Sequence, residues 1–228
     1  APAYLAYIAK QSGVRKMIYA SSCSVYGYAV NEFYDETGPT VAQYPYGLSK
    51  LQGERSVIEM SDENFSVIAF RKGTVSGYSP RMRLDLVVNT MFKCAMQDGV
   101  ITVNNPSIWR PILDINDCVK AYVRAIESDD KTSGVFNLAS NNYTVGEIAD
   151  MTAKRIEENT GKKIKLNIKN NPDIRNYKVN FDKIQTVFGY RPTGSIETIV
   201  DDLQNNLDKF EDFDNNNYYN IKVFKEQK

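Results

Sequence analysis

The chain has 228 residues, of which 42% are hydrophobic and 25% are charged, a balance that is typical of a globular protein. Lysine plus arginine equal aspartate plus glutamate at 28 each, so the net charge gives no reason to expect nucleic acid or an acidic membrane as a partner. Histidine is absent, which excludes Ser-His-Asp and Cys-His mechanisms and any metal site with a histidine ligand. Three scattered cysteines and the lack of a membrane-length apolar run lead us to expect a cytoplasmic protein.

The first half of the chain predicts strands that alternate with helices. Its elements, in chain order, are a helix in the first dozen residues, a buried strand at 16–20, a loop rich in Ser, Gly, Asn and Pro at 21–44, a helix at 45–60, a strand at 65–70, a helix at 84–96 and a short strand at 100–103. Such alternation favours a doubly wound α/β architecture with parallel strands.

The second half continues the alternation and carries fewer residues suited to catalysis. Its predicted elements are a helix at 115–126, a strand at 134–138, a helix from 144 to 156 that begins with a capping box, a half-exposed strand at 163–168 and helices at 181–187 and 196–210. The tail after Asp212 has no strong pattern and is expected to be partly disordered. We therefore expect a smaller second lobe after about Val103.

A tyrosine and a lysine four residues apart form the most informative pair. Tyr46 and Lys50 fall within the predicted helix 45–60, where residues i and i+4 share one face. A nearby positive charge favours the ionised form of a phenol, which makes a tyrosine more useful as a general acid or base. The pair alone has little specificity, because the chain has 15 tyrosines.

Hydroxyl side chains follow the strand that precedes this helix. Ser21, Ser22 and Ser24 come directly after the predicted strand 16–20. Ligands of open α/β sheets bind beyond the carboxyl ends of the strands, so a serine here is placed to hold a substrate oxygen. An ordinary serine-rich turn explains the same residues equally well.

Five segments in one order resemble the extended short-chain dehydrogenase/reductases, the family of the nucleotide-sugar epimerases and dehydratases. Residues 21–27 have the form SSxxVYG and residues 45–50 the form PYGxSK. Residues 71–77 look like the family's segment beneath the nicotinamide, and residues 109–117 are similar to its R-x-[YF]-[IV]-H-V-x-D segment. Residues 173–190 resemble the segment that holds a sugar nucleotide, and the likeness reaches about Leu207.

The resemblance implies a role for each matching residue. Tyr46 would be the general acid/base at the sugar, Lys50 would hold the nicotinamide ribose, and Ser22 would bind the reacting oxygen. The implied cofactor-binding residues are Ser21, Tyr46, Lys50, Lys72, Thr74 and Val75. The implied substrate-binding residues are Ser22, Ser24, Asn89, Arg110, Asp173, Arg175 and Tyr177. NAD is the expected cofactor, NADP stays open, and no metal is implied.

Two departures from the family pattern narrow these expectations. The Asp-Glu pair of the family's 4,6-dehydratases is replaced by Cys23 and Ser24, so a dehydratase is not expected. The glycine-rich dinucleotide fingerprint GxxGxxG is absent from the sequence. We therefore expect a Rossmann-like doubly wound sheet whose first half is missing from this chain. Residues 1–103 are expected to belong to the cofactor domain. Residues 104–228 are expected to form mostly a substrate lobe, although some of their elements return to the core of the cofactor domain. A chain of this kind is expected to bind cofactor weakly by itself.

The implied activity is NAD-dependent C4 epimerisation of a nucleotide-hexose, carried out by a homodimer. One alternative is an NAD(P)H-dependent 4-keto nucleotide-sugar reductase. Another, of a different class, is a non-catalytic relative that binds the dinucleotide as a signal. Such relatives usually lose the tyrosine or the lysine, and this chain keeps both Tyr46 and Lys50.

Overall fold

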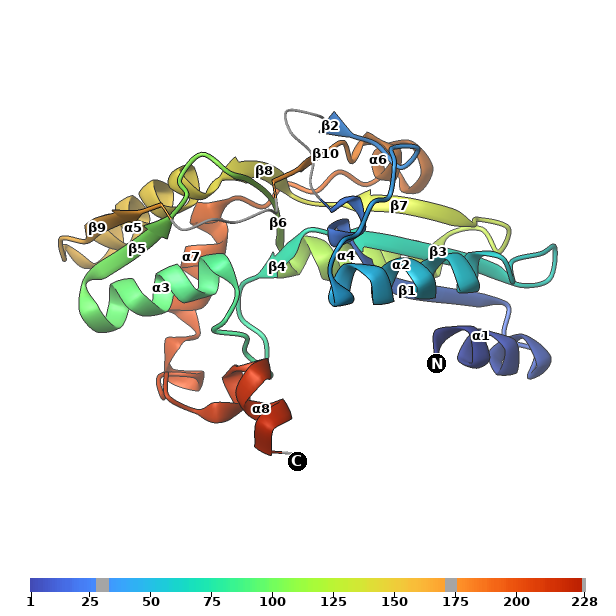
Figure 1. Cartoon of the computed structure of the whole chain (residues 1–228), viewed down its shortest axis with the longest axis horizontal. Helices are drawn as coiled ribbons and strands as arrows, with labels where there is room; N and C mark the ends of the chain where they lie inside the picture. Colours follow the sequence, from blue (N-terminus) through green and yellow to red (C-terminus); the bar gives the residue numbers. More distant parts are fainter. Residues whose placement is uncertain (28–32, 171–175, 227–228) are drawn as a thin grey trace.

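A three-stranded parallel sheet forms the centre of one half of the molecule. The computed structural model describes residues 1–27, 33–170 and 176–226. The sheet consists of β1 (Lys16–Ser22), β3 (Ser66–Lys72) and β7 (Gly134–Leu138) in the order β1-β3-β7, with every pair parallel (Figure 1). Parallel neighbours need long crossover connections, and helices provide them here. The predicted α/β fold with parallel strands is confirmed.

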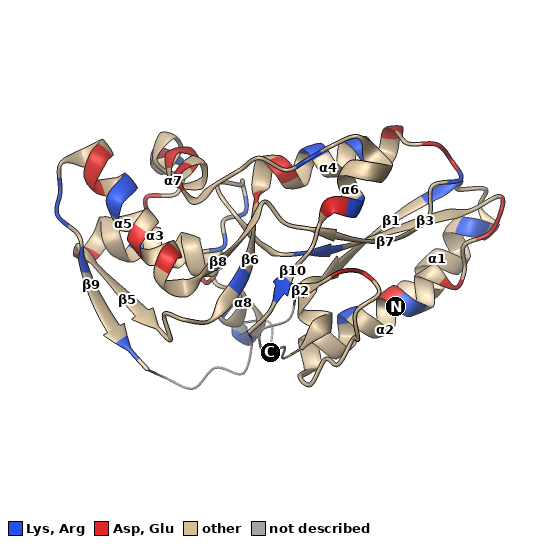
Figure 2. Cartoon of the chain, turned by 90° about the horizontal axis from the view of Figure 1, so that it is seen from above, with Lys and Arg blue, Asp and Glu red and all other residues tan. Residues whose placement is uncertain are grey.

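Helices cover both faces of this sheet. Figure 2 shows α1 (Pro2–Gln11) and α2 (Pro45–Ile58) on one side of the strands, with α4 (Ile115–Glu127) and α6 (Asp182–Phe188) on the other. The central strand β3 is therefore buried at every position except its last, which explains its continuous apolar run. Phe70 of this strand packs against the rings of three aromatic residues, Tyr122, Phe136 and Phe188.

The other half is built around three helices. α3 (Val87–Asp98), α5 (Val145–Thr160) and α7 (Ile196–Asn205) pack together, and β5 (Val100–Asn104) pairs in parallel with β9 (Lys165–Lys169). Their inward side chains form one apolar cluster with members from each helix, such as Phe92, Ile148 and Leu203. The helix α5 begins with the predicted capping box of Thr144 and Glu147.

Short strands connect the two halves. β4 (Thr74–Ser76), β6 (Trp109–Asp114) and β8 (Asn141–Thr144) form a second three-stranded sheet in the order β4-β6-β8. A small parallel pair joins β2 (Phe33–Tyr34) to β10 (Lys178–Val179). None of these strands was predicted, because none of them is a continuous apolar run of four or more residues.

Three expectations about local structure were wrong. The segment 21–44 contains a 3₁₀ helix, η1 (Cys23–Tyr26), in addition to β2. All five residues of β9 are exposed, where a half-exposed strand was expected, because neither face of this strand is covered closely enough to bury its side chains. The predicted helix 196–210 stops at Asn205, and the short 3₁₀ helix η2 (Leu207–Lys209) follows.

The tail also differs from its expected disorder. It contains the 3₁₀ helix η3 (Asn216–Tyr218) and the short helix α8 (Asn220–Glu226). The Tyr218 carbonyl accepts a hydrogen bond of 3.0 Å from the Leu84 N–H, which fixes this segment beside the start of α3. Within the described residues, no helix is both long enough and apolar enough to cross a membrane.

Candidate active site

Helix α2 presents Tyr46 and Lys50 at the carboxyl end of β1. Pro45 is the first residue of the helix, a position where proline's fixed φ is favourable and its missing N–H costs nothing. The Lys50 Nζ lies 5.8 Å from the centroid of the Tyr46 ring and donates a 2.9 Å hydrogen bond to the Ala20 carbonyl. Tyr46 is 56% exposed, so its phenol is accessible to a ligand.

The surroundings of Lys50 disfavour its positive charge. Burial against β1 lowers the pKa of Lys50, and the nearby cation of Lys72 lowers it further. A ligand with hydroxyl groups or negative charge between the two lysines would relieve both effects. The Lys50 ammonium gives one of its three N–H groups to Ala20, which leaves the others for such a ligand.

Ser22 and Ser24 lie at the carboxyl end of strand β1, next to the start of α2. Ser22 ends the strand and caps η1, where its Oγ accepts a hydrogen bond of 3.2 Å from the Ser24 N–H. The Ser24 Oγ is buried and has no hydrogen-bond partner among the described residues. At Gly47 of α2, an added Cβ would lie 2.8 Å from the Ser24 carbonyl oxygen, so the helix start rests directly on η1. Ser22, Tyr46 and Lys50 are thus gathered at one end of β1.

The other predicted cofactor residues fall in three places. Ser21 points away from Ser22 and donates a 2.6 Å hydrogen bond to the Glu54 carboxylate. Lys72 ends β3 as the register partner of Ser22, and its Nζ lies 5.5 Å from the Tyr122 ring centroid.

Thr74 and Val75 belong to β4, opposite Ile112 and Leu113 of β6. A Cβ at Gly73, between β3 and β4, would lie 2.7 Å from the Pro111 carbonyl oxygen, so this connection crosses β6 closely. The close approach explains why a glycine occupies the position between the two strands.

The predicted substrate residues are more dispersed. Tyr177 is buried in one apolar cluster with Tyr26 and Tyr34, beside η1. Arg110 is buried in β6 and donates to the Trp109 carbonyl at 2.9 Å. Asp173 and Arg175 lie outside the described residues.

Asn89 is buried in α3, and backbone groups bind its side chain. Its Oδ1 accepts a hydrogen bond of 3.1 Å from the Gly77 N–H, and its Nδ2 donates to the carbonyls of Gly77 and Arg83. Within the described residues, Asn89 therefore fixes the segment that leads from β4 into α3.

Cys23 has the surroundings of a structural thiol. Its side chain is 1% exposed, and its Sγ donates to the Arg71 carbonyl at 3.0 Å. Burial raises the pKa of Cys23 far above its usual value, although the Arg71 charge opposes this. A buried thiol that stays protonated is a poor nucleophile.

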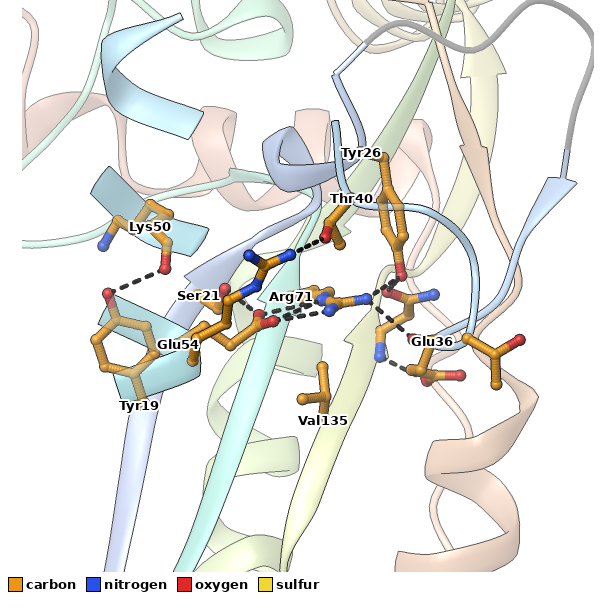
Figure 3. Close-up of polar contacts among 12 residues, drawn as sticks. Tyr19, Ser21, Tyr26, Glu36, Thr40, Lys50, Glu54, Arg71 and Val135 are labelled. Carbon is orange, nitrogen blue, oxygen red and sulfur yellow. Dashed lines mark hydrogen bonds and ion pairs between the residues drawn. The ribbon is translucent and has the colours of Figure 1, made fainter. Parts of the chain in front are cut away.

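A buried ion pair beneath the site was missed from the sequence. Glu54 of α2 and Arg71 of β3 form a two-pronged contact, and Arg71 also donates to the Tyr26 hydroxyl at 2.9 Å (Figure 3). Glu54 follows Tyr46 by eight residues and Lys50 by four, so helical spacing places it on their face. That spacing was the available signal for Glu54, but nothing in the sequence identified Arg71 as its partner.

Known proteins with similar sequences include nucleotide-sugar epimerases by name. The chain is 28% identical over 150 residues to a putative UDP-arabinose 4-epimerase 2 of Arabidopsis thaliana, a match that covers 56% of this chain and 36% of the relative. It is 27% identical over 148 residues to a probable UDP-arabinose 4-epimerase 3 of the same plant, with the same coverage. The matches thus span little more than a third of these relatives.

Solved structures of the same fold include several with NAD bound. A UDP-glucuronic acid 4-epimerase from Bacillus cereus, in complex with UDP-glucuronic acid and NAD, superposes with a TM-score of 0.77 at 22% identity, covering 91% of this chain and 66% of that one. A dTDP-glucose 4,6-dehydratase from Bacillus anthracis, in complex with NAD, gives 0.77 at 18% identity, covering 93% and 68%. At such identities the likeness establishes the fold alone.

A family profile decides the classification. The profile described as the NAD dependent epimerase/dehydratase family matches residues 2–139, which include β1, α2, β3 and the residues gathered at their ends. The order of motifs, the parallel sheet and the tyrosine–lysine helix are consistent with this match. The chain belongs to the NAD dependent epimerase/dehydratase family.

Proposed function

We propose that this chain carries the catalytic group of an NAD-dependent 4-epimerase that acts on a nucleotide-sugar. The observation that carries the proposal is the placement of Tyr46 and Lys50 on α2, with Lys50 bonded to the end of the strand that bears Ser22. A phenol, an ammonium group and a hydroxyl can together supply the proton transfer that accompanies reversible oxidation of a secondary alcohol.

Each of the three residues has a separate task. Tyr46 takes the proton of the sugar hydroxyl at C4 and later returns it to the ketone oxygen. Lys50 holds a positive charge 5.8 Å from the Tyr46 ring centroid and binds ribose hydroxyls with its remaining N–H groups. The Ser22 hydroxyl bonds to the reacting oxygen and keeps it next to Tyr46. When NAD is bound, it supplies the hydride acceptor and donor, so one cycle leaves its redox state unchanged.

The donor set at the end of β1 fits such a cofactor. Lys50 and Lys72 both lie there and the Lys72 cation disfavours the charge of Lys50, while the buried Ser24 Oγ lacks a partner among the described residues. On this proposal Lys72, Thr74, Val75 and Ser21 support or contact the nicotinamide end.

Among the family's activities, a 4-epimerase is favoured over the alternatives. The curated relatives that match this chain are named 4-epimerases, which supports epimerisation over a one-way ketone reduction. Cys23 and Ser24 occupy the places of the dehydratase acid and base, and neither has a carboxyl group. Ser24, Asn89, Arg110, Tyr177, Asp173 and Arg175 stay as the proposed substrate residues, four of them from residues 104–228.

A homodimer through α1 and α2 is part of the proposal. Tyr4 and Leu5 on α1 are 71% and 61% exposed, and α1 packs beside α2. Apolar side chains of this size on one helix are typical of a surface that another chain covers. Light scattering of the protein, compared with its Leu5→Glu variant, tests the dimer: a wild-type monomer would contradict it.

The activity can be tested without added coenzyme. The protein at its natural length is incubated with UDP-glucose, UDP-galactose, UDP-glucuronic acid or a UDP-pentose, and the anomeric protons are followed by NMR. We expect the C4 epimer of at least one sugar, because an epimerase regenerates its own NAD. No epimer with any of them, together with NADPH-dependent reduction of a 4-keto sugar, would instead establish the reductase.

A further inference from the structure

Beneath the proposed catalytic group lies an ion pair that touches none of its reacting atoms. We infer that Glu54 and Arg71 are positioning residues, which fix the rotation of α2 and the end of β1 so that Tyr46, Lys50 and Ser22 meet in one geometry. The inference rests on the proposed function and adds two residues to it.

The contact between Glu54 and Arg71 is two-pronged and buried. The Arg71 Nη2 lies 2.7 Å from one carboxylate oxygen of Glu54, and its Nε lies 3.0 Å from the other. The two residues are 2% and 5% exposed. A two-pronged contact between planar groups fixes orientation as well as distance, which a single bond does not.

Glu54 controls the direction of the helix face that carries the chemistry. Tyr46, Lys50 and Glu54 follow one another at intervals of four residues, so they lie along one face of α2. Anchoring Glu54 to β3 therefore sets the rotation of the helix about its axis. It also determines where the Tyr46 phenol and the Lys50 ammonium point.

The same carboxylate holds the strand that carries the catalytic serine. The Ser21 Oγ donates a hydrogen bond of 2.6 Å to Glu54, and Ser21 directly precedes Ser22. Because successive side chains of a strand point to opposite faces, fixing Ser21 towards α2 also fixes the direction of Ser22. One carboxylate thus couples both elements of the site.

Arg71 is held from its other side as well. Its Nη1 donates to the Tyr26 hydroxyl at 2.9 Å and to the Glu36 carbonyl at 3.2 Å (Figure 3). The Tyr26 hydroxyl in turn lies 2.7 Å from the Asn137 Oδ1 of β7. The guanidinium therefore has little freedom to follow α2 if the helix moves.

Stability is a poor explanation for this network. Removing two charges from water is costly, and apolar side chains of similar size often stabilise a protein as well as a buried ion pair does. A buried pair that spans the two elements of an active site is better explained by the geometry it imposes.

The chain offers a matched control for the experiment. Arg155 of α5 binds Asp201 of α7 through two bonds of 2.7 Å, in the other half of the molecule. The variants Arg71→Lys and Arg155→Lys each keep the charge and replace a two-pronged contact by a single one. For each variant we would measure kcat, KM and the melting temperature. The pKa of Lys50 would be measured by NMR of ¹³C-methylated lysines, with the Lys50→Arg variant used to assign the Lys50 signal.

We expect Arg71→Lys to lower kcat by on the order of 10- to 100-fold with KM within about twofold, since small misplacements of catalytic groups have effects of this size. The pKa of Lys50 should rise towards that of an ordinary lysine as α2 loosens from β1. Arg155→Lys should change neither kcat nor the pKa of Lys50. A lower melting temperature for Arg71→Lys with an unaltered kcat and Lys50 pKa would overturn the inference.

Two further outcomes of this experiment also test the inference. If Arg71→Lys does not fold, the double variant Glu54→Leu with Arg71→Met replaces the pair by apolar groups. Retained kcat in that variant overturns the inference, and a loss with native melting supports it. If the wild type shows no turnover at all, the proposed function fails, and the Lys50 pKa alone then decides whether the pair positions α2.

Discussion

The two halves of the molecule fill their interiors differently. Around the sheet β1-β3-β7, charged and polar side chains are buried at the carboxyl ends of the strands, among them Glu54, Arg71 and Asn137. The interior formed by α3, α5 and α7 is mainly an apolar cluster, with the uncharged Asn89 and Thr152 as its buried polar residues. Its arginine pair lies at the surface, where the Arg155 side chain is 32% exposed.

This difference in buried polar groups separates residues that orient an active site from residues that stabilise the fold. Burying a charge is costly unless it is fully bonded, so a buried polar network indicates a requirement other than cohesion. The carboxyl ends of parallel strands are also where open α/β sheets bind their ligands. We infer that the first half is built around a site and the second around a core, and the predictions below test that division.

The largest effect is expected from Tyr46→Phe. Loss of the phenol removes the proposed acid/base group and should reduce turnover by on the order of 10³-fold. The melting temperature should not change, because Tyr46 is 56% exposed and its hydroxyl makes no hydrogen bond within the described residues. Turnover assays with calorimetry check this. A variant as active as the wild type would remove the mechanism.

Phe92→Ala should have the opposite profile. Phe92 is fully buried in the apolar cluster of the second half, so the cavity should lower the free energy of unfolding by about 3–5 kcal/mol. The Lys50 pKa should stay at its wild-type value wherever the variant is folded. Urea unfolding and lysine NMR measure the two quantities. A shifted Lys50 pKa would show that the halves are not separable.

Asp117→Asn tests a polar network at the junction of the halves. Burial alone would raise the pKa of Asp117, but hydrogen bonds from Ser140, Tyr190, Gly194 and Thr193 hold it below its usual value. Since the folded pKa is the lower one, the stabilisation is present above the unfolded value of about 3.9 and is lost as the pH falls through the folded value.

At neutral pH we therefore expect the wild type to be more stable than Asp117→Asn by about 2 kcal/mol. The difference should shrink in acid, as the pH falls below the unfolded value and towards the lowered pKa of the folded state. Urea unfolding at pH 7 and at pH 3 gives both values. A gap of equal size at the two pH values would contradict the assignment.

The smallest effect is expected at the start of α5. The Thr144 Oγ1 accepts a hydrogen bond of 3.1 Å from the Glu147 N–H, and the Glu147 carboxylate accepts one of 2.7 Å from the Thr144 N–H. Thr144→Ala should lower the free energy of unfolding by about 1 kcal/mol without affecting activity. Thr144→Ser serves as the control that keeps the cap. Equal losses in both variants would exclude capping as the cause.

Local patterns predicted much of the fold. The strands β1, β3 and β7 were visible as apolar runs. β3 is buried at every position but its last, because both of its faces are covered, whereas the expected buried strand β1 is mostly half-buried. The helix of Tyr46 and Lys50 and the capping box of Thr144 and Glu147 were also predicted, since each is formed by residues within one or two turns of each other. The family resemblance supplied the proposed roles.

The sequence by itself therefore determined the order of the main elements and the tyrosine–lysine pair. Only the tertiary structure decided that Arg71 meets Glu54, that Tyr177 packs beside Tyr26 and that Asn89 is bound by backbone groups. Periodicity reports the geometry of one helix or strand, because it arises from contacts a few residues apart. A contact between distant segments depends on how whole elements pack, and no spacing in the sequence records that.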